Sequence, residues 1–211
     1  MKHPALKVAM AMLTFLMGIT LASSYRQSMP SKSPEQSRPS KPCTSDRYFP
    51  QGVLDQDEVK NLSLAEFYGA MMEEPLECQK NKEEIYRVLI LPSAKPPATV
   101  RIWRQGTQKY ITVLKLYNVG IPQHGAKDLE RNQTRLLTEQ EWEHFQMLLQ
   151  QAHFWSMSSM ETKPKNTATF FLLEGYKENH HHVVARFQPE EQSFLDSCRF
   201  LLKISGLGTI E

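Results

Sequence analysis

The chain has 211 residues, of which 40% are hydrophobic and 23% are charged, as is ordinary for a soluble globular domain with short appendages. Its formal net charge of +2 is unevenly distributed, because residues 1–44 carry six of the 25 Lys and Arg residues and one of the 23 acidic residues. The remaining residues hold 19 basic and 22 acidic side chains, a net charge of −3. A slightly acidic domain is poorly suited to bind a phosphate backbone, so we expect no nucleic-acid partner.

The first 24 residues have the pattern of an export signal. A short basic start precedes an uncharged apolar run over residues 8–21, and the small residues Ala22 and Ser24 follow it. The run is shorter than the roughly 20 residues that cross a bilayer core. Residues 1–24 are predicted to be a cleaved signal peptide, with an uncleaved inner-membrane anchor over residues 8–24 as the alternative and a buried helix disfavoured. Both leading interpretations place the rest of the chain in the periplasm or outside the cell, with membrane contact only through an uncleaved leader.

Residues 25–47 form a linker rich in Pro, Ser and Lys. Such a composition has too little apolar surface to offset the entropy lost on ordering. We therefore expect a disordered tether that joins the leader to a globular domain over residues 48–211.

The domain begins with a predicted helix and three predicted strands. Apolar residues recur at helical spacing over residues 64–72, Ser63 and Glu66 have the capping-box pattern before them, and Pro75 ends the helix. Gly106-Thr107 is typical of a two-residue hairpin turn between the last two strands. The strand-like runs are rich in β-branched and aromatic residues and cover residues 84–91, 98–105 and 108–117.

The second half of the domain follows a polar loop. Thr138 and Glu141 have the pattern of a second capping box, and an apolar helical stripe follows and ends near residues 153–155. Two more strands are predicted over residues 167–176 and 180–188. A last helix is predicted to begin at Pro189 and to end at Gly206.

This order of helix, three strands, helix, two strands and helix predicts an α+β fold. Runs of strands joined by short turns favour a sheet of about five mostly antiparallel strands. We expect one domain with its helices packed on one face of that sheet.

Several phrases of the second half form a recognisable pattern. They are Leu137-Thr138 leading to Glu141-Trp142 and Phe145, Phe154-Trp155, Leu173-Glu174-Gly175, His182-Val183-Val184 with Arg186, and Leu201-Leu202 with Ser205-Gly206-Leu207. Together, over roughly residues 84–207, they resemble a group of uncharacterised exported bacterial domains. The pattern departs from that group at Phe187-Gln188, before Pro189. Because the group has no assigned activity, the resemblance implies a bacterial, envelope-side domain and supplies no catalytic residue.

The three consecutive histidines at 180–182 are the most conspicuous candidate for chemistry. On a strand, His180 and His182 project to the same face and can share a zinc ion. A third ligand would come from elsewhere, with Glu174, His144 and His153 as candidates. The alternative, which we favour, is that His180 and His181 finish a polar turn. No Gly-x-Ser-x-Gly, P-loop or HExxH motif occurs in the sequence.

The three cysteines have different expected roles. Cys198 lies on the apolar face of the last helix and is expected to be a small buried hydrophobe. Cys43 and Cys78 lie before the first strand and can form a disulfide in an oxidising compartment. Cys78 also has lysines nearby, so a reactive thiol is the lesser alternative.

One strand face suggests a surface for a partner. Arg101, Trp103 and Gln105 alternate with apolar residues and would share one face, which can serve as a docking surface, unless Trp103 belongs to the core. Because no motif for catalysis occurs, we expect a non-catalytic accessory or interaction module that binds an unknown envelope protein or ligand. A metal-binding protein or metal-dependent enzyme centred on His180 and His182 is the alternative function.

Overall fold

The computed structural model describes residues 48–54, 58–79, 81–118, 129–160 and 169–208. The predicted leader over residues 1–24 and the predicted tether over residues 25–47 lie outside the described residues. The described residues belong to one compact unit. Within these described residues, no helix is long and apolar enough to cross a membrane.

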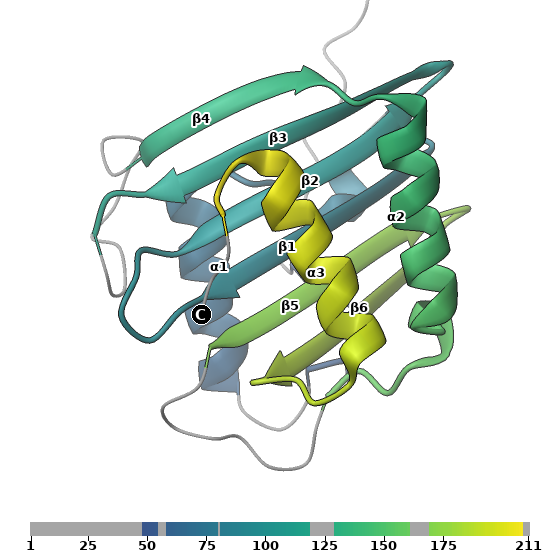
Figure 1. Ribbon diagram of the computed structural model, residues 1–211. Coiled ribbons are helices and arrows are strands. Elements are labelled where there is room, and N and C mark those ends of the chain that lie inside the picture. Colours follow the sequence, from purple (N-terminus) through teal and green to yellow (C-terminus); the bar gives the residue numbers. More distant parts are fainter. Residues whose placement is uncertain (1–47, 55–57, 80, 119–128, 161–168, 209–211) are drawn as a thin grey trace, which may run out of the picture. The chain divides into compact units, whose positions relative to one another are not determined.

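The α+β fold is confirmed, with a six-stranded sheet in which all neighbouring strands are antiparallel (Figure 1). The sheet order is β4-β3-β2-β1-β5-β6, so β1 lies near the centre. The strands are β1 (Glu84–Leu91), β2 (Ala98–Gln105), β3 (Gln108–Leu116), β4 (Leu129–Leu136), β5 (Phe170–Lys177) and β6 (His180–Phe187). The helices are α1 (Glu58–Ala70), α2 (Glu139–Gln151) and α3 (Gln192–Ser205), with short 3₁₀ turns η1 (Leu76–Cys78) and η3 (Phe154–Ser156).

The helices cover both faces of the sheet, which differs from the expected arrangement on one face. α2 and α3 pack on one face, over a core that includes Tyr86 and Val88 of β1 (Figure 1). α1 packs on the other face, where Leu89 of β1 belongs to its core. β1 is buried along nearly its whole length, and a strand that is apolar on both faces needs a layer on each.

Strand β4 is the element that the periodicity did not reveal. Its sequence, LERNQTRL, lacks apolar alternation, and residues 132–136 are exposed. Pairing with β3 along the backbone, from Tyr110↔Leu136 to Leu116↔Leu129, holds it at the edge of the sheet. Backbone hydrogen bonding does not depend on side-chain polarity, so the sequence signal for such a strand is weak.

The helix ends agree only in part with the predictions. The second capping box is confirmed, since the Thr138 side chain accepts from Glu141 N and the Glu141 carboxylate accepts from Thr138 N. Gly206 ends α3 in the left-handed conformation, as expected. The N-cap predicted at Ser63 is wrong, because α1 begins at Glu58 and Ser63 lies inside it.

Gly175 of β5 allows a close approach of aromatic rings on the α2 side of the sheet. A Cβ atom at this position would lie 2.8 Å from Phe154 Cε1 and 3.0 Å from Tyr86 Cδ1. The rings of Tyr86 and Phe154 are in edge contact, with centroids 6.3 Å apart. The missing side chain therefore makes room for the packing that anchors η3 to the sheet.

Candidate functional site

A buried cluster of charges joins the sheet to the segment after α1. Arg87 of β1 is fully buried and donates to Glu174 of β5 through Nε (2.9 Å) and Nη2 (3.1 Å). Its Nη1 donates to Glu73 Oε2 (3.1 Å) and to the backbone oxygen of Glu74 (2.9 Å). Arg101 of β2 also pairs with Glu73, at 2.5 Å.

Tyr68 and His181 complete this cluster. The Tyr68 hydroxyl donates to Glu174, and the Arg87 guanidinium lies 3.8 Å from the centroid of the Tyr68 ring. His181 Nε2 lies 3.3 Å from Glu174 Oε2, and its Nδ1 lies 3.3 Å from Glu77 Oε1. Burial opposes ionisation of Glu174, but Arg87 and His181 outweigh it and lower its pKa. Each charged group of the cluster is thus paired with another protein group, and these pairs connect η1 to the sheet.

The predicted interaction surface is only partly exposed. Arg101 is engaged with Glu73, and Trp103 is 9% exposed in a small core with Leu76 and Ile85. Gln105 alone is exposed. Trp103 therefore belongs to the core, because η1 covers this face of the sheet.

The predicted metal-ligand pair packs against aromatic rings. The rings of His180 and His182 are 6.2 Å apart, and both lie near Trp155, at 5.3 and 6.1 Å between centroids. Burial, and then the charge of His180, lower the pKa of His182. Among the described residues, no three His, Cys, Asp or Glu side chains are grouped to hold a metal ion.

The three candidates for a third ligand lie elsewhere. Glu174 contacts His181, because odd and even positions of β6 project to opposite faces of the sheet. His144 packs against Phe200, and His153 is an exposed residue at the start of η3. None of them is brought to the His180 and His182 pair.

The cysteines follow the expected division in part. Cys198 is a free, buried thiol in the α3 core, and burial raises its pKa. Cys78 is disulfide-bonded. Its predicted partner, Cys43, lies outside the described residues, and that pairing stays a prediction.

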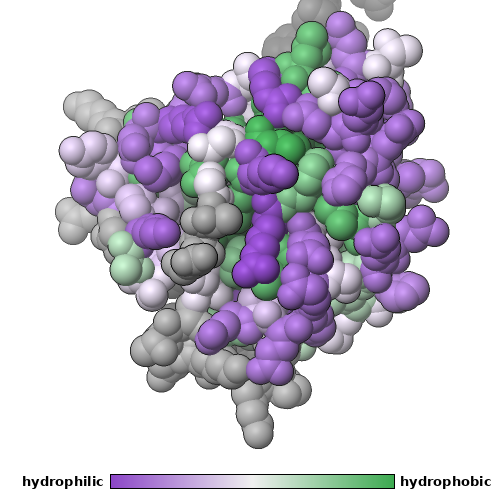
Figure 2. Space-filling model, in the orientation of Figure 1, coloured by the Kyte–Doolittle hydropathy of each residue, from purple (hydrophilic) through white to green (hydrophobic). Residues whose placement is uncertain are grey.

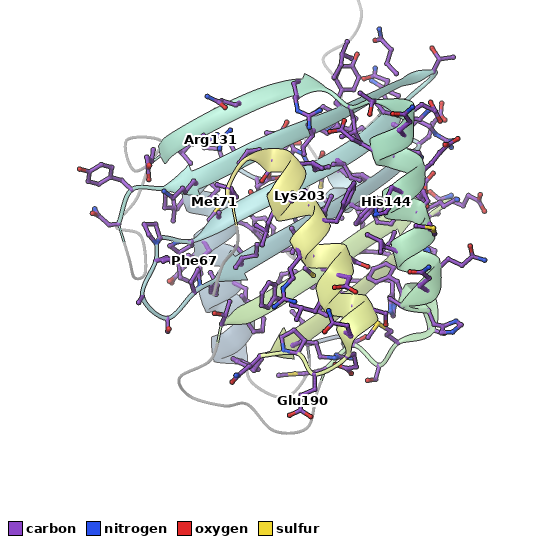
Figure 3. The ribbon with its side chains drawn as sticks, viewed as in Figure 1. Phe67, Met71, Arg131, His144, Glu190 and Lys203 are labelled. Atoms are coloured by element: carbon purple, nitrogen blue, oxygen red, sulfur yellow. The ribbon has the colours of Figure 1, made fainter. Side chains whose placement is uncertain are left out.

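A groove of about 720 Å³ lies between α2 and α3. Leu148 of α2 and Phe200 of α3 supply apolar lining, and the His144 ring packs on Phe200 with centroids 4.6 Å apart. Figure 2 shows hydrophobic patches near the centre of this side of the molecule, beside a column of hydrophilic residues. Figure 3 shows His144 on α2 and Lys203 on α3, the two helices that form the groove. The groove is larger than the hollow beside Trp155, of about 590 Å³.

The rim of this groove is positively charged at one end. Arg199 and Lys203 of α3 line it, are exposed, and make no hydrogen bond or ion pair with another described residue. Asp196 lies on the same rim toward the start of α3, and its Oδ1 accepts from Gln192 Nε2 at 2.5 Å. Among the described residues, the groove thus combines an apolar floor with two cations and one carboxylate on its rim.

Sequence reasoning did not find this groove, although part of its signal was present. Arg199 and Lys203 are four residues apart on the polar side of a helix, which is visible in the sequence. The apolar floor was not visible, because it exists only where α2 and α3 lie side by side.

Comparison with known proteins adds no assignment. No protein-family model matches the chain, and no curated protein sequence matches it significantly. The resemblance to exported bacterial domains therefore stays a prediction.

Proposed function

We propose that this domain is a non-catalytic interaction module on the envelope side of a bacterial cell, and that a partner docks in the groove between α2 and α3. The observation that carries the proposal is the groove itself, an open apolar floor beside two cations that form no ion pair with a described residue. Non-catalytic binding surfaces typically have this anatomy, with an apolar centre and a polar rim.

The state of the clustered ionisable groups supports a non-catalytic role. Arg87, Glu174 and Glu73 are buried, and Arg87 donates to both carboxylates, so the three charges are fixed in place. A general acid or base needs access to a substrate proton. The groups of this cluster whose pKa is shifted are instead enclosed under α1 and η1. There they connect η1 to the sheet.

The experiment that tests docking is site-specific photocrosslinking in the native cell. Phe200, which lines the groove, is replaced by p-benzoylphenylalanine, and Tyr117, which is 69% exposed away from the groove lining, carries the same substitution as the control. We expect a discrete adduct from position 200 and none from position 117. Equal adducts from both positions, or none from either, would contradict the proposal.

Metal binding at His180 and His182 is the alternative, and one observation favours it. His182 Nε2 is buried and makes no hydrogen bond with a described residue. A buried polar atom normally has a partner, and a metal ion would supply one here. Metal content by mass spectrometry of the untagged protein decides between the two. A near-stoichiometric metal that is lost when His180 and His182 are both changed to Ala would favour this alternative. Equal trace content in both proteins would leave the docking proposal ahead.

A further inference from the structure

The two cations on the groove rim are like-charged neighbours on one helix, with the carboxylate of Asp196 one turn before Arg199. Lys203 follows Arg199 by four residues on α3, a spacing at which like charges repel each other. Lys203 lies in the last turn, where the helix dipole favours a cation. Arg199 lies one turn earlier, three residues after Asp196, and forms no ion pair with a described residue.

The form of the groove favours a helix over a small enclosed ligand. Its lining on α3 runs from Asp196 to Gly206, which corresponds to roughly 15 Å at 1.5 Å per residue. It lies open on the surface (Figure 2), whereas a small-molecule site normally buries most of its ligand. A two-helix groove of this length matches the mode in which an amphipathic helix lays its apolar face between two helices.

We propose that the partner segment is an acidic amphipathic helix, an inference that rests on the proposed docking function. Its apolar side chains contact Leu148 and Phe200, and its carboxylates pair with Arg199 and Lys203. The acidic end of the segment lies toward the C-terminal end of α3, because Asp196 repels carboxylates at the opposite end. The partner chemistry therefore includes both a one-sided apolar stripe and an acidic flank.

The test is a peptide-display selection on the immobilised full chain, from a random 16-residue library. We expect enriched peptides with apolar residues at three- and four-residue spacing and with Asp or Glu beside them. Enriched apolar peptides without acidic residues would overturn the charge inference and leave the groove as a docking site. Failure to enrich any peptide over a Phe200→Glu chain would remove support from docking itself.

Matched single-charge variants then test the pairing for a selected peptide. Arg199→Glu is compared with Lys95→Glu, which makes the same change in net charge at an exposed residue outside the groove lining. We expect about tenfold weaker binding for Arg199→Glu, little change for Lys95→Glu, and a loss that shrinks at high salt. Rescue by a peptide in which one Glu is changed to Lys would support a direct ion pair. Equal losses in both variants would overturn it.

Binding to an anionic membrane surface is the outcome that would replace the acidic helix as the proposed partner. Vesicles of phosphatidylcholine with one quarter phosphatidylglycerol carry anionic groups without a helix. If these vesicles bind the chain in an Arg199-dependent way while the acidic peptides do not, the inference of an acidic helix is overturned.

Discussion

Replacing Arg87 by Met tests whether the buried charge cluster holds the domain together. Arg87 donates four hydrogen bonds, two of them to Glu174, and its side chain is fully buried. Breaking a buried pair by removing one partner costs about 3–5 kcal/mol, because the other charge is left without compensation. Glu73 retains Arg101, and Glu174 retains Tyr68 and His181. We therefore expect the lower end of that range, about 3 kcal/mol.

The assay is urea unfolding of the full chain, followed by circular dichroism, at pH 7 and at pH below 4. In thermal unfolding of the same proteins, a loss of about 3 kcal/mol corresponds to about 6–12 °C in Tm for a domain of this size. The folded pKa of Glu174 is lowered, so its contribution to stability is present above the unfolded value of about 4.3 and is lost as the pH falls through the folded value. The difference between wild type and Arg87→Met should therefore shrink in acid.

Arg104→Met is the matched control for this substitution. Arg104 is 36% exposed and pairs with Glu83 and Glu84 near the end of β2, so we expect a cost of at most about 1 kcal/mol. The reasoning about burial fails if Arg87→Met costs no more than Arg104→Met, or if its cost does not change with pH.

Three further predictions concern the packing around Gly175, the start of α2 and the shifted pKa of Lys82. Gly175→Ala forces a Cβ against Phe154 and Tyr86 and should cost about 1–3 kcal/mol in urea unfolding; an unchanged midpoint would show that these rings yield easily. Thr138→Ala removes one half of the α2 capping box and should cost about 1 kcal/mol in the same assay, while a neutral result would assign the helix start to packing alone. Burial, and then the charge of Arg101, lower the pKa of Lys82 to about 8. Competitive acetylation should show half-maximal reactivity of Lys82 near pH 8, and a midpoint near the ordinary lysine pKa of about 10.4 would contradict this.

The strands of the central sheet could be read from the sequence because their signals are local. β1 and β2 have the bounds predicted for them, and the hairpin at Gly106 connects β2 to β3. β-branched and aromatic runs bounded by turn residues carry this information within a few residues. β4 has no such run, and only its pairing with β3 makes it a strand.

The predictions of site residues depended on contacts between residues far apart in the chain, and they agree with the structure only in part. Alternation correctly places His180 and His182 on one face of β6, but it cannot show which groups meet them across the sheet. His181, rather than either neighbour, contacts Glu174, and Trp103 is covered by η1. These outcomes depend on which element packs over each face.

The sequence by itself determined the α+β class, the bounds of β1 and β2 and the cap at Thr138, because periodicity and capping act between residues close in the chain. Tertiary structure alone decided that α1 covers the second face, that Arg87 meets Glu73 and Glu174, and that α2 and α3 enclose a groove. Those features join residues far apart in the chain, and their energies arise from burial and pairing that exist only once the layers have assembled.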